Sequence, residues 1–144
     1  MRNTICTTIA AMALAGQLLA GGFYLSLGNP EASPEARKLN AVLTIKATGC
    51  HDPATAKIYA TAIGMVNGQR REIPLKLEQL PSAGMFALTQ QWPKEGQWVI
   101  QLVGKNDGMF TNSLIAAGPA GIDRFHDHAS NKEFSTAEVD ALLH

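Results

Sequence analysis

The dipeptide Asn67-Gly68 is the feature that most constrains the fold of this 144-residue chain. Asn and Gly tolerate the positive φ angles of a type I′ turn, which joins two antiparallel strands through a two-residue loop. Pairing Val66 with Gln69 across this turn sets the register of both flanking strands. On one face of that ladder the pairs beyond the two nearest the turn are apolar: Ala62 with Ile73, Ala60 with Leu75 and Ile58 with Leu77. The two nearest the turn, Val66 with Gln69 and Gly64 with Arg71, each include a polar side chain. Because turn chemistry and face polarity select the same register, we predict a β-hairpin over residues 56 to 79.

The opposite face of this hairpin mixes polar and apolar side chains, which is typical of a solvated surface. Its pairs are Met65 with Arg70, Ile63 with Glu72, Thr61 with Pro74 and Tyr59 with Lys76. Because proline has no N–H to donate to a ladder, Pro74 indicates a sheet edge or a bulge.

Further strand signals follow one another at short intervals. Alternating or apolar segments at 39–48, 85–92, 97–103 and 109–117 are separated by turn residues. The turn Pro93-Lys94-Glu95-Gly96 predicts a second hairpin between residues 85 and 103, with Trp98 facing the core. The turn Lys105-Asn106-Asp107-Gly108 follows it. About six or seven strands without helices between them predict an all-β fold, an immunoglobulin-like antiparallel β-sandwich over residues 39–121.

The polar tail, residues 122–144, ends in a predicted short helix. Ser135 and Glu138 have the spacing of a capping box, and Phe134 and Val139 have that of a hydrophobic staple. Val139, Leu142 and Leu143 form one apolar stripe. We therefore expect the helix to dock, either on its own sandwich or on a partner.

The first 28 residues have the layout of an export segment. No charged side chain occurs from Thr4 to Gly28, after the basic Arg2. This predicts a signal peptide, with cleavage after Ala15 or after Ala20. The alternative is an uncleaved membrane anchor, because the apolar run of about 25 residues can span a bilayer. Either reading places the domain outside the cytoplasm, as a periplasmic, secreted or membrane-anchored protein.

Residues 29–38 are rich in Pro, Ala and charge, and we interpret them as a linker. The whole chain has 12 basic and 12 acidic residues. Because this balance leaves no basic field, nucleic-acid binding is disfavoured. Contact with a membrane is expected only through the N-terminal segment, if that segment is uncleaved.

Two histidines in the tail are the main metal-ligand candidates. His126 and His128 form a His-x-His pair, which on an extended segment places both imidazoles on one face. Cys50, His51 or Asp123 could complete a copper or zinc site. The alternative is that the histidines are solvated and that Cys50 is buried or paired with another chain. No other cofactor is expected.

The sequence does not favour an enzyme. In Cys50-His51-Asp52 the neighbouring side chains of a strand would point to opposite faces, so a nucleophile and its base would not meet there. No serine elbow, phosphate loop or pair of catalytic carboxylates is recognisable.

Residues 84–88, Gly-Met-Phe-Ala-Leu, and residues 92–102, Trp-Pro-Lys-Glu-Gly-Gln-Trp-Val-Ile-Gln-Leu, carry a resemblance. They resemble the closing hairpin of small bacterial extracytoplasmic domains of the YtkA-like and FixH-like type. The resemblance covers about a third of the chain beyond the leader and implies an immunoglobulin-like fold. Some relatives are associated with copper handling or with the assembly of membrane oxidases, but this chain lacks a Met- and His-rich loop.

Together these patterns predict a non-catalytic extracytoplasmic β-sandwich module that binds an envelope protein. The alternative hypothesis is a periplasmic copper- or zinc-binding protein that uses His126 and His128 with His51 or Cys50.

Overall fold

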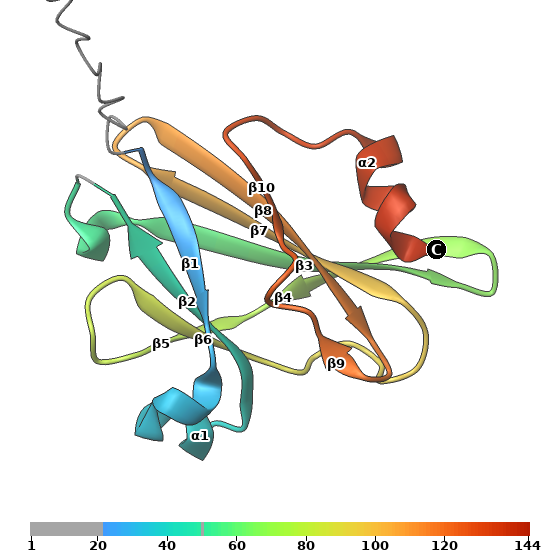
Figure 1. The fold of residues 1–144 in the computed structure, drawn as a ribbon, viewed down its shortest axis with the longest axis horizontal. Coiled ribbons are helices and arrows are strands. Elements are labelled where there is room, and N and C mark those ends of the chain that lie inside the picture. Colours follow the sequence, from blue (N-terminus) through green and yellow to red (C-terminus); the bar gives the residue numbers. More distant parts are fainter. Residues whose placement is uncertain (1–21, 50) are drawn as a thin grey trace, which may run out of the picture.

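The computed structural model describes residues 22–49 and 51–144. Two antiparallel sheets pack together in two layers (Figure 1), with strand orders β1-β2-β6-β5 and β10-β8-β7-β3-β4, and β9 pairs with β8. The prediction of an all-β sandwich with a short C-terminal helix is confirmed. The described residues form ten strands rather than six or seven. The additional ones are short segments whose pairing, rather than their alternation, makes them strands.

The first sheet contains β1 (Tyr24–Gly28), β2 (Ala41–Thr48), β6 (Met85–Thr89) and β5 (Leu77–Gln79). The second contains β3 (Lys57–Val66), β4 (Gln69–Leu75), β7 (Trp98–Asn106), β8 (Met109–Gly118), β9 (Gly121–Ile122) and β10 (His128–Ser130). The helical segments are η1 (Pro30–Ala32), α1 (Pro34–Lys38), η2 (Pro53–Thr55), α2 (Thr136–Asp140) and η3 (Ala141–Leu143). Within the described ranges, none of these helices has the length and apolar character needed to cross a bilayer.

The core lies between the two sheets and is anchored by Trp98, as predicted. Its side chain is only 2% exposed, and its indole Nε1–H donates to the carbonyl oxygen of Glu95 at 3.0 Å. The indole ring lies against Gly64, where an added Cβ would come within 2.5 Å of the ring. Glycine is therefore required at position 64 for this packing. The largest fully buried aliphatic side chains around it are Leu43, Ile45, Leu88, Ile100, Leu102 and Ile115.

The β3–β4 hairpin has the predicted register from Val66–Gln69 to Ala60–Leu75, and Asn67 and Gly68 both have positive φ. The predicted pair of Ile58 with Leu77 is wrong, because Leu77 pairs with Leu88 in the other sheet. The chain changes sheets at Lys76, whose backbone N–H and C=O bond to the Gln91 side chain at 2.9 and 2.8 Å. This carboxamide takes the place of a strand partner. Pro74 lies on β4, which is an edge strand. A sheet edge was one of the two predicted alternatives.

The predicted hairpin between residues 85 and 103 does not form. Strand β6 pairs with β2 and β5 in one sheet, whereas β7 pairs with β3 and β8 in the other. Trp92 is buried in the same cluster as Trp98. The connection between β6 and β7 therefore bridges the two layers instead of closing a turn within one sheet.

The fold begins earlier than residue 39. Strand β1 pairs with β2, and Phe23 and Leu25 are buried in the core. Residues 23–28 therefore belong to the sandwich rather than to the predicted export segment of residues 1–28. The apolar side chains of Phe23, Leu25 and Leu27 contribute to the core. Both predicted cleavage points lie outside the described residues, so the choice between signal peptide and anchor stays a prediction.

The segment 29–38 is not an unpacked linker. It forms η1 and α1, and the Ser33 hydroxyl caps α1 by accepting the Ala36 N–H at 3.2 Å. Ala36 is fully buried against Leu80 and Ala87. Asn29-Pro30 and Ser33-Pro34 are N-cap residues followed by proline at the first helical position, which was the overlooked signal.

Helix α2 docks on its own sandwich, one of the two predicted alternatives. Its capping box is present, with the Glu138 N–H donating to Ser135 Oγ at 3.3 Å and the Ser135 N–H donating to Glu138 Oε2 at 2.7 Å. Val139 and Leu143 are buried on the outer face of the second sheet. They cover Ile63, which was predicted to lie on a solvated face.

Candidate functional site

Helix α2 covers only part of the outer face of the second sheet. Val139 and Leu143 pack on Ile63, Val99 and Leu114. Toward the other end of the same strands, none of the described helices lies over this face of the sheet (Figure 1). We call this uncovered region the open face. Its outward-pointing residues are Lys57, Tyr59, Val103, Lys105 and Phe110.

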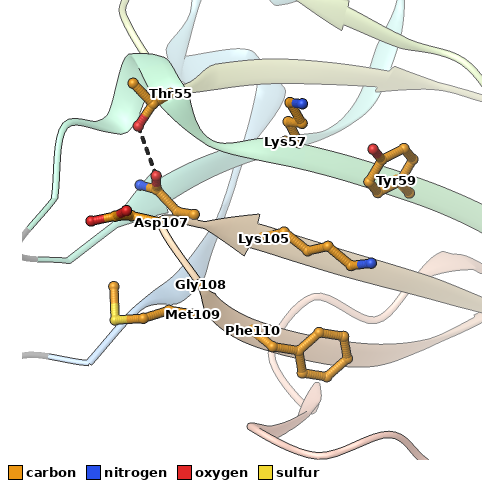
Figure 2. Close-up of a pocket in the computed structure, with 9 residues that line it drawn as sticks. Thr55, Lys57, Tyr59, Lys105, Asp107, Gly108, Met109 and Phe110 are labelled. Carbon is orange, nitrogen blue, oxygen red and sulfur yellow. Dashed lines mark hydrogen bonds between the residues drawn. The ribbon is translucent and has the colours of Figure 1, made fainter.

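Strand register brings the open face together from three strands. Lys57 on β3 is opposite Lys105 on β7, which is opposite Phe110 on β8. Tyr59 is opposite Val103. Figure 2 shows Lys57, Tyr59, Lys105 and Phe110 projecting from these neighbouring strands on one side of the sheet.

The two lysines form a like-charge pair. Such residues directly opposite in an antiparallel ladder repel each other and destabilise the sheet. Among the described residues, none of the ion pairs includes Lys57 or Lys105. Their charges are therefore not neutralised by direct contact with an acidic side chain in this part of the chain.

The open face also presents apolar area. The Tyr59 side chain is 56% exposed, and Val103 and Phe110 are half-buried. A hollow of about 510 Å³ lies on this face, lined by Tyr59, Phe110 and the two lysines together with the β7–β8 turn. Aromatic rings beside ammonium groups can bind a ligand that is both apolar and anionic.

The end of the hollow is held by hydrogen bonds. Asn106 is 3% exposed, its Nδ2 donates to the Asp52 carbonyl oxygen at 3.1 Å, and its Oδ1 accepts from the Thr55 hydroxyl at 2.7 Å (Figure 2). The Asp107-Gly108 turn has positive φ at both residues, which fits a tight hairpin. Helix η2 and the β7–β8 tip therefore form one preorganised rim of the open face.

His51, one of the predicted metal ligands, lies beside this rim. Its Nδ1 is 3.2 Å from Asp107 Oδ2. The neighbouring Asp52 carboxylate accepts from the Ala54 N–H at 2.9 Å and caps η2. Cys50 lies outside the described residues, so its predicted roles stay predictions.

His126 and His128 lie elsewhere on the second sheet. His126 Nδ1 is 2.9 Å from Asp123 Oδ2, in the loop between β9 and β10. This hydrogen bond, together with one from the Phe125 N–H, lowers the pKa of the Asp123 carboxyl. His128 is opposite Leu114 in β10 and lines a small hollow of about 210 Å³ beside α2.

Among the described residues, His51 is separated from the predicted ligands His126 and His128. His128 is level with Leu114, whereas His51 contacts the hairpin tip next to Met109, five positions along β8. Five residues of strand span about 17 Å. Across residues 22–49 and 51–144, no cluster of three or more His, Cys, Asp or Glu side chains could hold a metal ion.

Comparisons with known proteins found no matching family model, no similar curated protein and no similar solved structure. The resemblance drawn from residues 84–102 therefore stays a prediction. The structure adds that these residues are split between β6 and β7 in different sheets, rather than forming one closing hairpin.

Sequence reasoning missed the open face. Lys57 and Tyr59 were visible as alternating residues of one strand, and Lys105 as the residue before a turn. Nothing local indicates that β3 pairs with β7, which is what places the lysines opposite each other.

Proposed function

We propose that this chain is a non-catalytic β-sandwich module on the extracytoplasmic side of the membrane, and that it binds another envelope protein through the open face. The observation that carries this proposal is the exposed Tyr59 beside Val103 and Phe110, on a sheet face whose other half is covered by α2. Tyrosine and phenylalanine are enriched at protein interfaces, where aromatic anchors contribute much of the binding energy.

The groups on the open face suit binding better than catalysis. Lysine ammonium groups and aromatic rings supply charge and contact area. The Thr55 hydroxyl at the rim is hydrogen-bonded to Asn106, and the Asp107 carboxylate contacts His51. None of these contacts forms the hydroxyl–base pair of an activated nucleophile.

The extracytoplasmic location rests on the sequence. The uncharged stretch after Arg2 predicts export, whether it is removed or retained. An envelope protein is therefore the class of partner that the module would meet.

Site-specific photo-cross-linking tests this proposal. A photoreactive phenylalanine analogue replaces Tyr59 in the full chain, which is expressed in cells with an intact envelope. The matched control carries the analogue at Phe125, which is 76% exposed in the loop between β9 and β10, away from the open face. We expect a discrete protein adduct from position 59 and none of the same size from position 125.

Absence of a discrete adduct at position 59 contradicts the proposal, and so does an identical adduct from both positions. A Phe110→Ser variant sharpens the test. Because Phe110 is half-buried on the open face, its loss should weaken the adduct at position 59 while the domain stays folded.

A further inference from the structure

We propose that the segment bound by the open face is acidic and carries an apolar anchor side chain, so that its carboxylates neutralise Lys57 and Lys105 while the anchor lies between Tyr59 and Phe110. This inference rests on the proposed function and names the chemistry of the partner.

Lys57 and Lys105 are directly opposite on adjacent strands, about 5 Å apart along the hydrogen-bonding direction. A pair so placed repels. One carboxylate, or two neighbouring ones, can reach both ammonium groups and convert this repulsion into attraction.

Four acidic side chains near this face or at the other end of the second sheet already have an ion-pair or hydrogen-bond partner. Asp107 contacts His51, and Asp52 caps η2. Glu72 and Asp140 both pair with Arg70, at the other end of the sheet. Because none of the ion pairs among the described residues includes Lys57 or Lys105, carboxylates of another molecule can complement their charge.

The shape of the open face suits an apolar anchor side chain. Tyr59 on β3 and Phe110 on β8 flank strand β7, so two strand spacings of about 5 Å each separate their backbones. Val103 and Lys105 lie on β7 between them, and the Lys105 side chain passes between the two rings in Figure 2. Its methylene stem offers apolar contact and its ammonium group offers charge. An anchor of the partner can pack on this stem.

The magnitude of the charge favours a protein over a lipid surface. A lysine near an anionic membrane contributes about 1 kcal/mol, so two lysines supply only about 2 kcal/mol. The chain as a whole has 12 basic and 12 acidic residues and no net charge to add to that attraction. A specific acidic segment with an apolar anchor uses the aromatic rings as well as the lysines.

The cross-link at position 59 provides the test. It is repeated in a Lys57→Glu/Lys105→Glu variant of the full chain. The matched control is Lys38→Glu/Lys94→Glu, which changes the net charge equally at exposed positions outside the open face. We expect the adduct to fall at least tenfold in the first variant, to persist in the control, and to weaken as salt concentration rises. The cross-linked partner peptide should contain Glu or Asp next to an apolar residue.

Charge exchange makes the test specific. Replacing the acidic residues of the cross-linked segment with Lys should restore the adduct with the Lys57→Glu/Lys105→Glu variant, and a milder Lys57→Gln/Lys105→Gln variant should weaken the adduct without reversing the charge. Thermal unfolding of each variant shows that the domain still folds.

The possible negative results of the cross-linking experiments overturn different claims. No adduct from the unaltered chain overturns the proposed function and this inference together. An adduct that is equally strong in all charge variants leaves the proposed function standing and overturns the acidic partner. Lysine-dependent binding to phosphatidylglycerol vesicles, with lipid rather than protein cross-linked at position 59, overturns it in favour of a membrane surface.

Discussion

The two halves of the outer face of the second sheet are built from the same strands and yet have opposite environments. At one end, Ile63, Val99 and Leu114 are buried under α2. At the other end, Tyr59 is exposed and two lysines occupy opposite positions on adjacent strands. The strand backbone is alike in both halves, so the difference comes from what the remaining chain places on top. The short C-terminal helix covers one half and leaves the other half uncovered.

The covered half is secured by several independent contacts. The capping box fixes the start of α2, Val139 and Leu143 supply apolar area, and Asp140 forms an ion pair with Arg70 of β4. The open half has no such cover, and Figure 1 shows α2 lying over only one end of the strands. The contrast shows how a few residues of a tail decide which part of a sheet is core and which is surface.

Truncating one side chain in each half should reveal the largest difference between them. Leu114→Ala should lower the free energy of unfolding by about 2–5 kcal/mol, because it removes a side chain that is 1% exposed. Tyr59→Ala should change it by no more than about 0.5 kcal/mol, because that side chain is mostly solvated. Urea denaturation measures both. Equal losses would show that the open face is packed after all.

A smaller effect is expected from the cap of α2. Ser135→Ala removes the hydroxyl that accepts the Glu138 N–H and should cost about 1 kcal/mol. Urea denaturation and amide hydrogen exchange at Val139 measure the change. Ser82→Ala, at an exposed serine outside any helix cap, is the control and should have no comparable effect. An unchanged exchange rate at Val139 would mean that the cap does not hold the covered half closed.

A substitution in the lysine pair of the open half should raise the free energy of unfolding, whereas the substitutions in the covered half lower it. Lys57→Glu replaces a repulsive cross-strand pair with an attractive one, so stability should rise by about 0.2–1 kcal/mol at low salt and less at high salt. Paired urea titrations at the two salt concentrations measure this. A stability that falls, or that is indifferent to salt, would indicate that Lys57 and Lys105 do not interact. A gain in stability with a loss of partner binding would show that the repulsion serves function.

The smallest expected effect is the loss of the α2 cap at low pH. Hydrogen bonds from the Ser135 N–H and hydroxyl lower the pKa of Glu138 below its ordinary value of 4.5. In this situation the unfolded state binds the proton more readily, so the contribution is fully present above pH 4.5 and is lost as pH falls through the lowered pKa. The protection factor of the Val139 amide, which is the ratio of the intrinsic to the observed exchange rate at each pH, should therefore fall in acid, and Glu138→Gln should flatten that dependence. Measuring the protection of the Val139 amide at a series of pH values shows whether protonation of Glu138 weakens the cap.

Sequence reasoning was accurate where a few adjacent residues set the geometry. Asn67-Gly68 fixed the turn and most of the β3–β4 register, and Ser135 with Glu138 defined the start of α2. Trp98 was identified as the core anchor because alternation in its own strand pointed it inward. In each case local dihedral preferences, side-chain caps or period-two alternation were sufficient.

The errors occurred where a distant residue decides the outcome. The Gln91 side chain replaces the ladder partner of Lys76, so the strand changes sheets. Strand β1 exists because β2 pairs with it, although its own residues look like the end of an export segment. The His126 and His128 pair and His51 are separated because β10 pairs along β8 at Leu114, away from the tip.

Residues that are close in the chain are enough to predict the fold class, the central hairpin, the anchor tryptophan and the capped helix, since each depends on backbone preferences and polarity within a short stretch. Long-range packing is needed to establish which strands share a sheet, which half of the outer face α2 covers, and that Lys57 lies opposite Lys105 near Tyr59 and Phe110. The reason is physical: strand partners and buried faces are chosen by packing between segments that are far apart in the chain, and this packing outweighs the preference of any one segment.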